Sequence, residues 1–130
     1  MTKVDGTLTG FGVRSMVAPL RRVAVRPPSL RGDYAVAHWA QPLDMTLLLD
    51  QHARFVDLLV SLGCGVDILP ASDDMPDACF TYDPSFVIPS GVIELRSAKA
   101  VRAGEPPLLT TQLVDLGVPR VARPSRRAES

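Results

Sequence analysis

The sequence predicts an α/β fold, and three observations lead to this class. A β-prone run, RRVAVRPPS, precedes a long amphipathic segment that ends in LG and continues directly into a second β-prone run, GVDILP. A shorter amphipathic segment also ends in LG and continues into VPRVA. Between these two units, CFTYDPSFVIPSGVIELR contains two β-rich runs separated by PSG, which is typical of a hairpin. Helices that lead directly into strands, in two places, indicate repeated β/α modules.

The first unit is expected to be a strand, a helix and a strand. We expect the first strand over residues 22–26, since the Pro-Pro pair after it removes two backbone donors. The amphipathic segment predicts a helix over residues 44–62, with Asp44 as its N-cap and Gly63 as the left-handed residue that ends it. GVDILP then predicts the second strand. The residues expected on the inward, apolar face of the helix are Leu48, His52, Phe55, Leu59 and Leu62.

The second unit is expected to begin with a loop at Pro76. This loop feeds a strand that starts near Cys79, with Pro84 at an irregularity, and the hairpin returns through VIELR. PPLLTTQLVDLG predicts a shorter helix that ends at Gly117, and VPRVA predicts a further strand. As domains, we expect a loose leader over residues 1–20, one α/β domain over residues 21–121 and a basic, disordered tail over residues 122–130.

Composition argues against several classes of function. The 14 Lys and Arg balance the 14 Asp and Glu, so no net charge recruits nucleic acid or an anionic membrane. No apolar run approaches the roughly 20 residues that span a bilayer, and the first residues lack a signal-peptide core, so a cytoplasmic protein is expected. No Cys or His spacing indicates a metal site, and no Gly-rich phosphate loop indicates a nucleotide, so no cofactor is expected.

The motif PDACFTYDP places two aspartates six residues apart, and Arg102 in VRAGEP follows the second after nineteen residues. On one straight strand Asp77 and Asp83 would lie about 20 Å apart, too far to share a small ligand. A shared site therefore requires a bend near Asp77, which Pro76 favours.

The order of these elements and motifs resembles the N-terminal part of the dimethylarginine dimethylaminohydrolase and amidinotransferase family, over roughly residues 21–121. The most specific pieces are PDACFTYDP and VRAGEP at their mutual spacing. The resemblance implies a partial pentein-type α/β propeller, with about two of five ββαβ modules. It also implies a role in arginine metabolism, in which dimethylarginine or a similar guanidine is hydrolysed to citrulline and an amine. In that reaction a cysteine thiolate attacks the guanidinium carbon and a histidine moves protons.

The resemblance also implies roles for individual residues. Asp77 matches the aspartate that holds the substrate α-amino group, Asp83 the one that binds the guanidinium, and Arg102 the arginine that holds the α-carboxylate. Phe80 matches the aromatic residue beside the site. An arginine-like substrate carries two cations and one anion, and two carboxylates with one guanidinium are its complement. Tyr82 departs from the family, which has glutamate there, and this puts the choice among guanidines in doubt.

The family cysteine and histidine have no match here. Cys64 and Cys79 fit small hydrophobes better than nucleophiles, His52 shares the helix stripe, and His38 lies in a loop. We therefore expect a truncated family member with no catalytic residues of its own, inactive alone. Turnover would then require a C-terminal partner that supplies the cysteine and the histidine. The alternatives are a non-catalytic binding module, which holds arginine-like ligands or pairs with itself or another subunit through its open sheet edges, and a fragment without function.

Each site residue also has an ordinary structural interpretation. Asp83 before a proline can be a polar residue at a strand edge, and Asp77 after a proline is a common turn residue. Arg102 can pair with Glu105 on the surface, where such a pair stabilises little.

Overall fold

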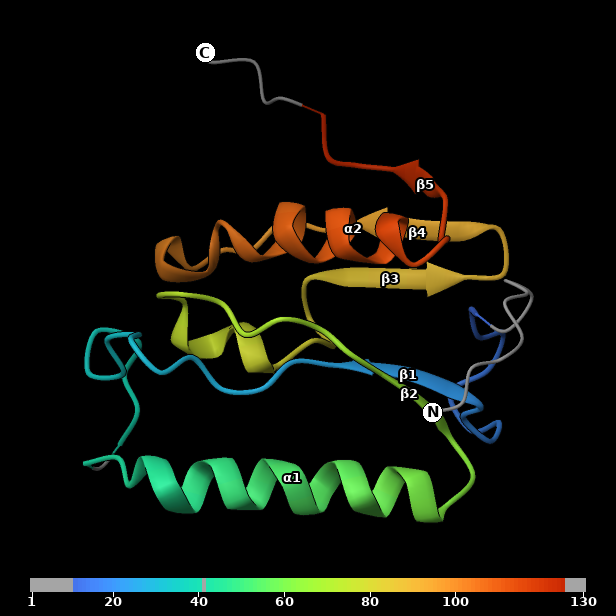
Figure 1. Cartoon of the computed structure of the whole chain (residues 1–130). Helices are drawn as coiled ribbons and strands as arrows, with labels where there is room; N and C mark the ends of the chain where they lie inside the picture. The colour runs from blue at the N-terminus through green and yellow to red at the C-terminus, as the bar shows by residue number, and fades with distance from the viewer. Residues whose placement is uncertain (1–10, 41, 126–130) are drawn as a thin grey trace.

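The computed structural model describes residues 11–40 and 42–125, so the predictions for residues 1–10 and 126–130 lie outside the described residues. Along the chain, helices separate the strands except at one hairpin (Figure 1). In order, the elements are β1 (Arg22–Val25), α1 (Met45–Ser61), β2 (Gly65–Ile68), the 3-10 helix η1 (Pro76–Cys79), β3 (Ser85–Ile88), β4 (Gly91–Glu94), the 3-10 helix η2 (Ala100–Arg102), α2 (Glu105–Asp115) and β5 (Arg120–Ala122).

The strands form two small sheets. β1 and β2 pair in parallel, from Arg22 opposite Gly65 to Val25 opposite Ile68. The second sheet has the order β3-β4-β5, with β3 antiparallel and β5 parallel to β4. This confirms the α/β class and the order of strands and α-helices in both predicted units: β1, α1 and β2 form the first, and β3, β4, α2 and β5 the second. Neither sheet of the described residues is closed.

Helix α1 begins and ends as the sequence predicts. The Asp44 side chain accepts a hydrogen bond from the Leu47 N–H at 3.0 Å. The predicted inward face was wrong in part, because Phe55 and Leu62 are 49% and 69% exposed. Leu48, Phe55 and Leu62 are seven residues apart, and each such step rotates a side chain by about 20° around the helix axis. Leu48 therefore lies on the covered face, whereas Phe55 and Leu62 are turned progressively away from it. The half-buried residues of α1 are Met45, Leu48, His52, Val56 and Leu59.

Both α-helices end in the same glycine motif. Gly63 and Gly117 adopt left-handed φ angles of 94° and 104°, a conformation that glycine reaches without steric cost. Each glycine N–H bonds to a helix carbonyl oxygen three residues earlier. The next N–H reaches back five residues, from Cys64 to Leu59 at 3.1 Å and from Val118 to Leu113 at 3.0 Å. These bonds turn the chain directly into β2 and toward β5.

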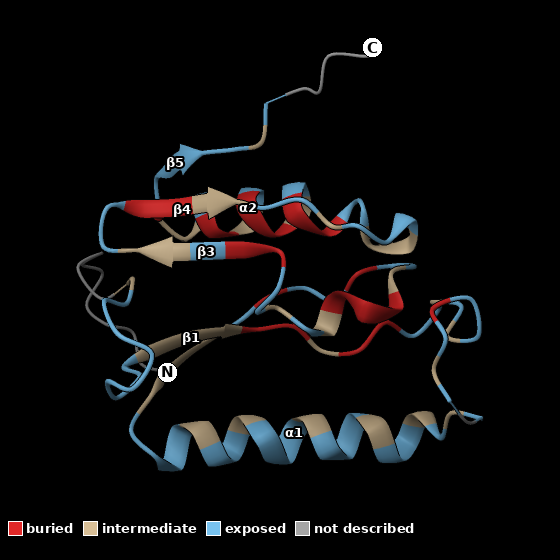
Figure 2. Cartoon of the chain, turned by 180° about the vertical axis from the view of Figure 1, so that it is seen from behind, coloured by how far each residue is buried: buried red, intermediate tan, exposed pale blue. Residues whose placement is uncertain are grey.

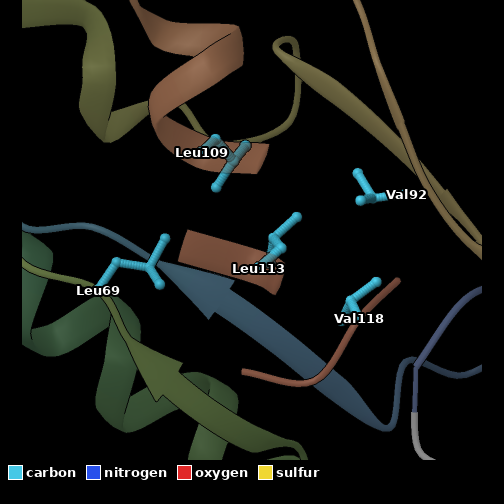
Figure 3. Packing of buried hydrophobic residues seen from close by; sticks show 5 residues of the cluster. All are labelled: Leu69, Val92, Leu109, Leu113 and Val118. Carbon is cyan, nitrogen blue, oxygen red and sulfur yellow. The ribbon is translucent and has the colours of Figure 1, made fainter. Parts of the chain in front are cut away.

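One apolar core joins the two units. Five buried side chains form a cluster between β2, β4 and α2 (Figure 3). They come from the residue after β2, from β4, and from α2 with the turn that follows it. These are Leu69, Val92, Leu109, Leu113 and Val118. Phe11 packs against the cluster, and the Val13 N–H bonds to the Val87 carbonyl oxygen at 3.3 Å, so part of the predicted leader lies along β3.

Burial is uneven across the molecule. The buried ribbon runs through β4, α2 and η1, whereas α1 has no buried residue and shows an exposed outer side (Figure 2). All three residues of β5 are exposed, and β5 forms an edge of its sheet. None of the helices in the described part of the chain is long and apolar enough to cross a membrane.

The strand predicted from Cys79 onward is wrong. Pro76 occupies the first position of η1, and the Ala78 and Phe80 N–H groups bond back to Met75 and Asp77, so the chain coils instead of extending. A proline is favoured at a helical start, since it has no N–H to leave unpaired there. The strand begins only at Ser85, after Pro84.

Candidate functional site

The Arg102 guanidinium lies at the centre of the candidate site. Its Nη1 donates to Asp83 Oδ2 at 2.7 Å, and its Nη2 donates to the carbonyl oxygens of Phe80 at 3.2 Å and Asp77 at 3.3 Å. Its Nε and Nη2 both donate to Glu105 Oε1, at 2.9 and 2.6 Å. The bend that the motif required is η1, which curls around this guanidinium. The four residues that the sequence singled out therefore meet at one place, although Asp77 and Phe80 reach it through their main chain.

A surface pocket of about 210 Å³ opens beside this cluster. Asp83 stands at its rim with a side chain that is 55% exposed, and among the described residues only its Oδ2 accepts a hydrogen bond. The Arg102 side chain is 13% exposed. The residues that line the pocket are Asp83, Pro84, Arg96, Ser97, Ala98, Arg102, Glu105 and Pro106. Asp77 and Phe80 are not among them, and Tyr82 is 76% exposed.

The Asp77 carboxylate has a partner that the sequence analysis missed. Asp77 is buried, and its Oδ1 accepts a hydrogen bond from the Trp39 indole N–H at 2.9 Å. The Trp39 ring stacks on Phe80, with centroids 6.0 Å apart, and meets Tyr34 edge-on at 4.6 Å. Only the fold brings Trp39 to the site, because 38 positions separate it from Asp77.

Glu105 holds Arg102 from below the surface. Its side chain is 1% exposed, so the predicted surface pair forms but is buried. The hydrogen bond to Glu105 raises the pKa of Arg102 above its ordinary value against the opposing effect of burial, and Asp83 adds to the rise. The second oxygen, Glu105 Oε2, is buried without a hydrogen-bond partner among the described residues. The spacing of three residues between Arg102 and Glu105 at a helix start was the available sequence signal.

Arg26 is a second buried guanidinium that the sequence analysis missed. It is 0% exposed and donates to the carbonyl oxygens of Ala78 at 2.7 Å and Pro70 at 3.2 Å, and also to the side chain of Gln112. Burial lowers the pKa of Arg26, and the attraction of Glu105 opposes this shift. Because Ala78 lies inside η1, Arg26 ties the end of β1 to the turn that surrounds Arg102.

The two cysteine thiols each donate to a main-chain carbonyl oxygen, Cys64 to that of Leu20 at 3.5 Å and Cys79 to that of Pro76 at 3.7 Å. Burial, followed by the nearby Asp77, raises the pKa of the Cys79 thiol to about 11, so this thiol is neutral at pH 7. Cys64 is half-buried just after the end of α1, and His52 lies on α1 beside Phe55. His38 is exposed in the loop before Trp39, with a φ of 67°. Among the described residues no group of three or more His, Cys, Asp or Glu could hold a metal ion.

Comparison with known proteins identifies the fold. The sequence matches no family model and no curated protein. Among solved structures, dimethylarginine dimethylaminohydrolase from Pseudomonas aeruginosa, a cysteine-to-serine mutant complexed with citrulline, matches with a TM-score of 0.66 and 20% identity. The match covers 79% of this chain and 41% of that one.

Two further structures support the same assignment. AgrE in a ternary complex with ornithine and NAD⁺ matches with a TM-score of 0.67 and 20% identity, over 80% of this chain and 16% of that one. The N-terminal domain of ArgZ, covalently bound to a reaction intermediate, matches with a TM-score of 0.66 and 19% identity, over 79% and 39%. The chain spans about two fifths of the length of the dimethylarginine dimethylaminohydrolase structures. Over about four fifths of its own length, this chain shares the fold of a part of each of these structures.

Proposed function

We propose that this chain is the substrate-recognition part of a guanidine-modifying hydrolase of the dimethylarginine dimethylaminohydrolase and amidinotransferase family, a partial pentein propeller. The observation that carries the proposal is the ion pair between Asp83 and the Arg102 guanidinium, 2.7 Å apart at the rim of a pocket. In this pair the Asp83 carboxylate binds a guanidinium group, which is the contact that we propose it makes with the substrate. The similarity to structures that hold citrulline and L-arginine supports the same ligand class.

The proposed roles follow from charge. The exposed Asp83 carboxylate binds the ligand guanidinium through a charge-assisted pair, which is the strong form of hydrogen bond. Asp77 binds the α-ammonium group, and its Oδ2 accepts no hydrogen bond from the described residues. Arg102 binds the α-carboxylate, and Phe80, half of whose surface is exposed, lies beside the ligand.

Turnover in this proposal requires a thiolate and a base from outside the described residues. The family reaction begins with attack by a cysteine thiolate on the guanidinium carbon, and the neutral Cys79 thiol is a poor candidate for that step. We therefore propose that the chain binds guanidines and that the reaction, which yields citrulline and an amine, depends on further modules.

Those further modules, or a second copy of the chain, would pair at β5. This strand bonds to β4 on one side, and its residues are exposed. An edge strand offers unpaired backbone groups to another strand. In analytical ultracentrifugation a dimer would show that the chain pairs with a second copy, whereas a monomer would mean that any pairing at β5 involves a different protein.

Binding tests the proposal directly. Isothermal titration of the purified chain with L-arginine, dimethylarginine and agmatine should show binding that Asp83→Asn weakens by about tenfold or more, as expected when one charged partner is lost. A matched control is Asp67→Asn, which breaks the 2.7 Å pair of Asp67 with Arg22 between β1 and β2. It should leave the affinities unchanged. Equal losses in both variants, or no binding by the unmodified chain, would contradict the proposal.

Activity is the second readout. Citrulline release from dimethylarginine and from arginine should be absent for the chain alone. Citrulline release that iodoacetamide abolishes would show that Cys64 or Cys79 is the nucleophile, against the argument from the Cys79 pKa.

A further inference from the structure

The loop between β1 and α1 is fastened to the segment that carries Asp77. The Ser29 hydroxyl, 1% exposed, donates to the Asp73 carbonyl oxygen at 3.0 Å, and the Tyr34 hydroxyl donates to the Ser29 carbonyl oxygen at 2.6 Å. Gly32 lies so close to Pro76 that an added Cβ would stand 2.9 Å from the proline ring. These contacts hold the loop where its last residues meet η1.

Trp39, in the later part of this loop, contacts the proposed ligand-binding carboxylate. The Trp39 indole N–H lies 2.9 Å from Asp77 Oδ1, and its ring stacks on Phe80. His38, immediately before it, has the one left-handed φ of a non-glycine residue in the described parts of the chain. Surrounding structure must hold such a conformation, which L-residues rarely adopt.

We propose that Trp39 is a positioning residue for recognition of the ligand α-ammonium group, an inference that rests on the proposed function. Its N–H fixes one oxygen of the Asp77 carboxylate and leaves Oδ2, which has no hydrogen bond from the described residues, for the ammonium group. An indole N–H only donates, so Oδ1 is the acceptor in this bond, which orients the Asp77 carboxylate. Trp39 therefore selects for ligands with an α-amino group and does not contact the guanidinium end.

The test compares two ligands that differ only in that group. L-arginine and 5-guanidinopentanoic acid, which lacks the α-amino group, are titrated into the unmodified chain and into Trp39→Phe, which keeps an aromatic ring for Phe80 but removes the N–H. The variant should bind L-arginine roughly tenfold more weakly, the factor for one hydrogen bond to a charged group, and the analogue with unchanged affinity. Tyr34→Phe is the control: it loosens the same loop without touching Asp77, and it should leave the ratio of the two affinities unchanged.

The outcomes separate this inference from the proposed function. If the unmodified chain binds both ligands and Trp39→Phe lowers both affinities equally, or lowers neither, the inference is overturned and the proposed function stands. If the unmodified chain binds neither ligand, both are overturned.

A measurement without ligand covers the case in which Trp39→Phe does not fold. Trp39 is the only tryptophan, so the ¹H–¹⁵N spectrum contains one indole cross-peak. Asp77→Asn should move this peak upfield, because a neutral amide accepts a weaker hydrogen bond than a carboxylate does. An unmoved peak would overturn the inference.

Discussion

Replacing Glu105 by glutamine keeps the size of the side chain and removes its charge. In the structure Glu105 is buried and accepts two hydrogen bonds from Arg102, whose side chain is also largely covered. The substitution therefore leaves a buried guanidinium with one carboxylate, that of Asp83, where it had two. The amide must also turn its oxygen toward Arg102, which places an NH₂ group where Oε2 had no partner.

The expected cost follows from this burial. Removing one member of a buried ion pair destabilises a protein by about 3–5 kcal/mol, and we expect the lower end, about 3 kcal/mol, because Arg102 keeps Asp83. Urea unfolding followed by circular dichroism measures the effect. With an m value of about 1.5 kcal/mol/M the unfolding midpoint should fall by about 2 M.

A surface pair in the same chain provides the control. Asp50 and Arg54 form an ion pair 2.9 Å apart on α1, with side chains 51% and 78% exposed. Asp50→Asn should cost at most about 0.5 kcal/mol, the value for an exposed pair one helical turn apart. If Glu105→Gln lowers the free energy of unfolding no more than Asp50→Asn does, the pair of Glu105 with Arg102 does not stabilise the fold as a buried ion pair, contrary to this prediction.

Three further predictions concern other parts of the chain. Ultraviolet titration of thiolate formation, with the other cysteine replaced by serine, should give a pKa of about 11 for Cys79, and a value near 9 would remove the effect of burial. Gly91→Ala should destabilise the fold by about 3 kcal/mol or more, because the added Cβ would lie 2.3 Å from a carbonyl oxygen next to β5. Gly63→Ala, whose Cβ would have no atom within 4 Å, should cost only about 1 kcal/mol for its left-handed φ. Equal urea unfolding midpoints for the two variants would contradict this prediction. Burial lowers the pKa of His52 below its ordinary value of 6.5, so the folded state binds fewer protons and the free energy of unfolding should fall as the pH drops below 6.5. His52→Leu should flatten that dependence in urea titrations on either side of this pH.

The sequence predicts the fold best where local signals act alone. The Asp44 cap and the glycines after both helices depend on a few adjacent residues, and all are found where expected. The predicted strand from Cys79 was wrong because distant groups fix the conformation of this segment. Arg26 and Arg102 donate to carbonyl oxygens of the turn from 52 and 22–25 positions away. Backbone acceptors that satisfy buried guanidinium groups stabilise a coil that propensity does not indicate.

The candidate site divides in the same way. The motif spacing marks Asp77, Asp83 and Arg102, and the structure gathers them at one guanidinium. Trp39 carries no local signal that connects it with Asp77, since the connection exists only once β1, α1 and β2 have folded. The burial of Glu105 is equally invisible, because an Arg and a Glu three residues apart are usually an exposed pair.

In the proposed function, the ion pair between Asp83 and Arg102 would make ligand binding an exchange of partners. A ligand guanidinium that takes the Asp83 carboxylate removes one acceptor from Arg102, whose side chain is only 13% exposed. L-arginine brings a carboxylate that can replace this acceptor, so each charge keeps a partner. Agmatine has the same guanidinium without the carboxylate and leaves Arg102 with Glu105 alone at its side-chain acceptors.

The exchange predicts a preference that depends on Asp83. The unmodified chain should bind L-arginine about tenfold or more tightly than agmatine, since an unreplaced hydrogen bond to a charged group costs about 1.5–3 kcal/mol. Asp83→Asn should weaken the binding of both ligands and reduce the ratio of the L-arginine affinity to the agmatine affinity. The asparagine does not neutralise Arg102, so no ion pair is broken when the ligand guanidinium binds. Titration calorimetry with both ligands measures the two ratios. A preference for agmatine, or a ratio that the substitution leaves unchanged, would show that the ligand does not compete with Arg102 for Asp83.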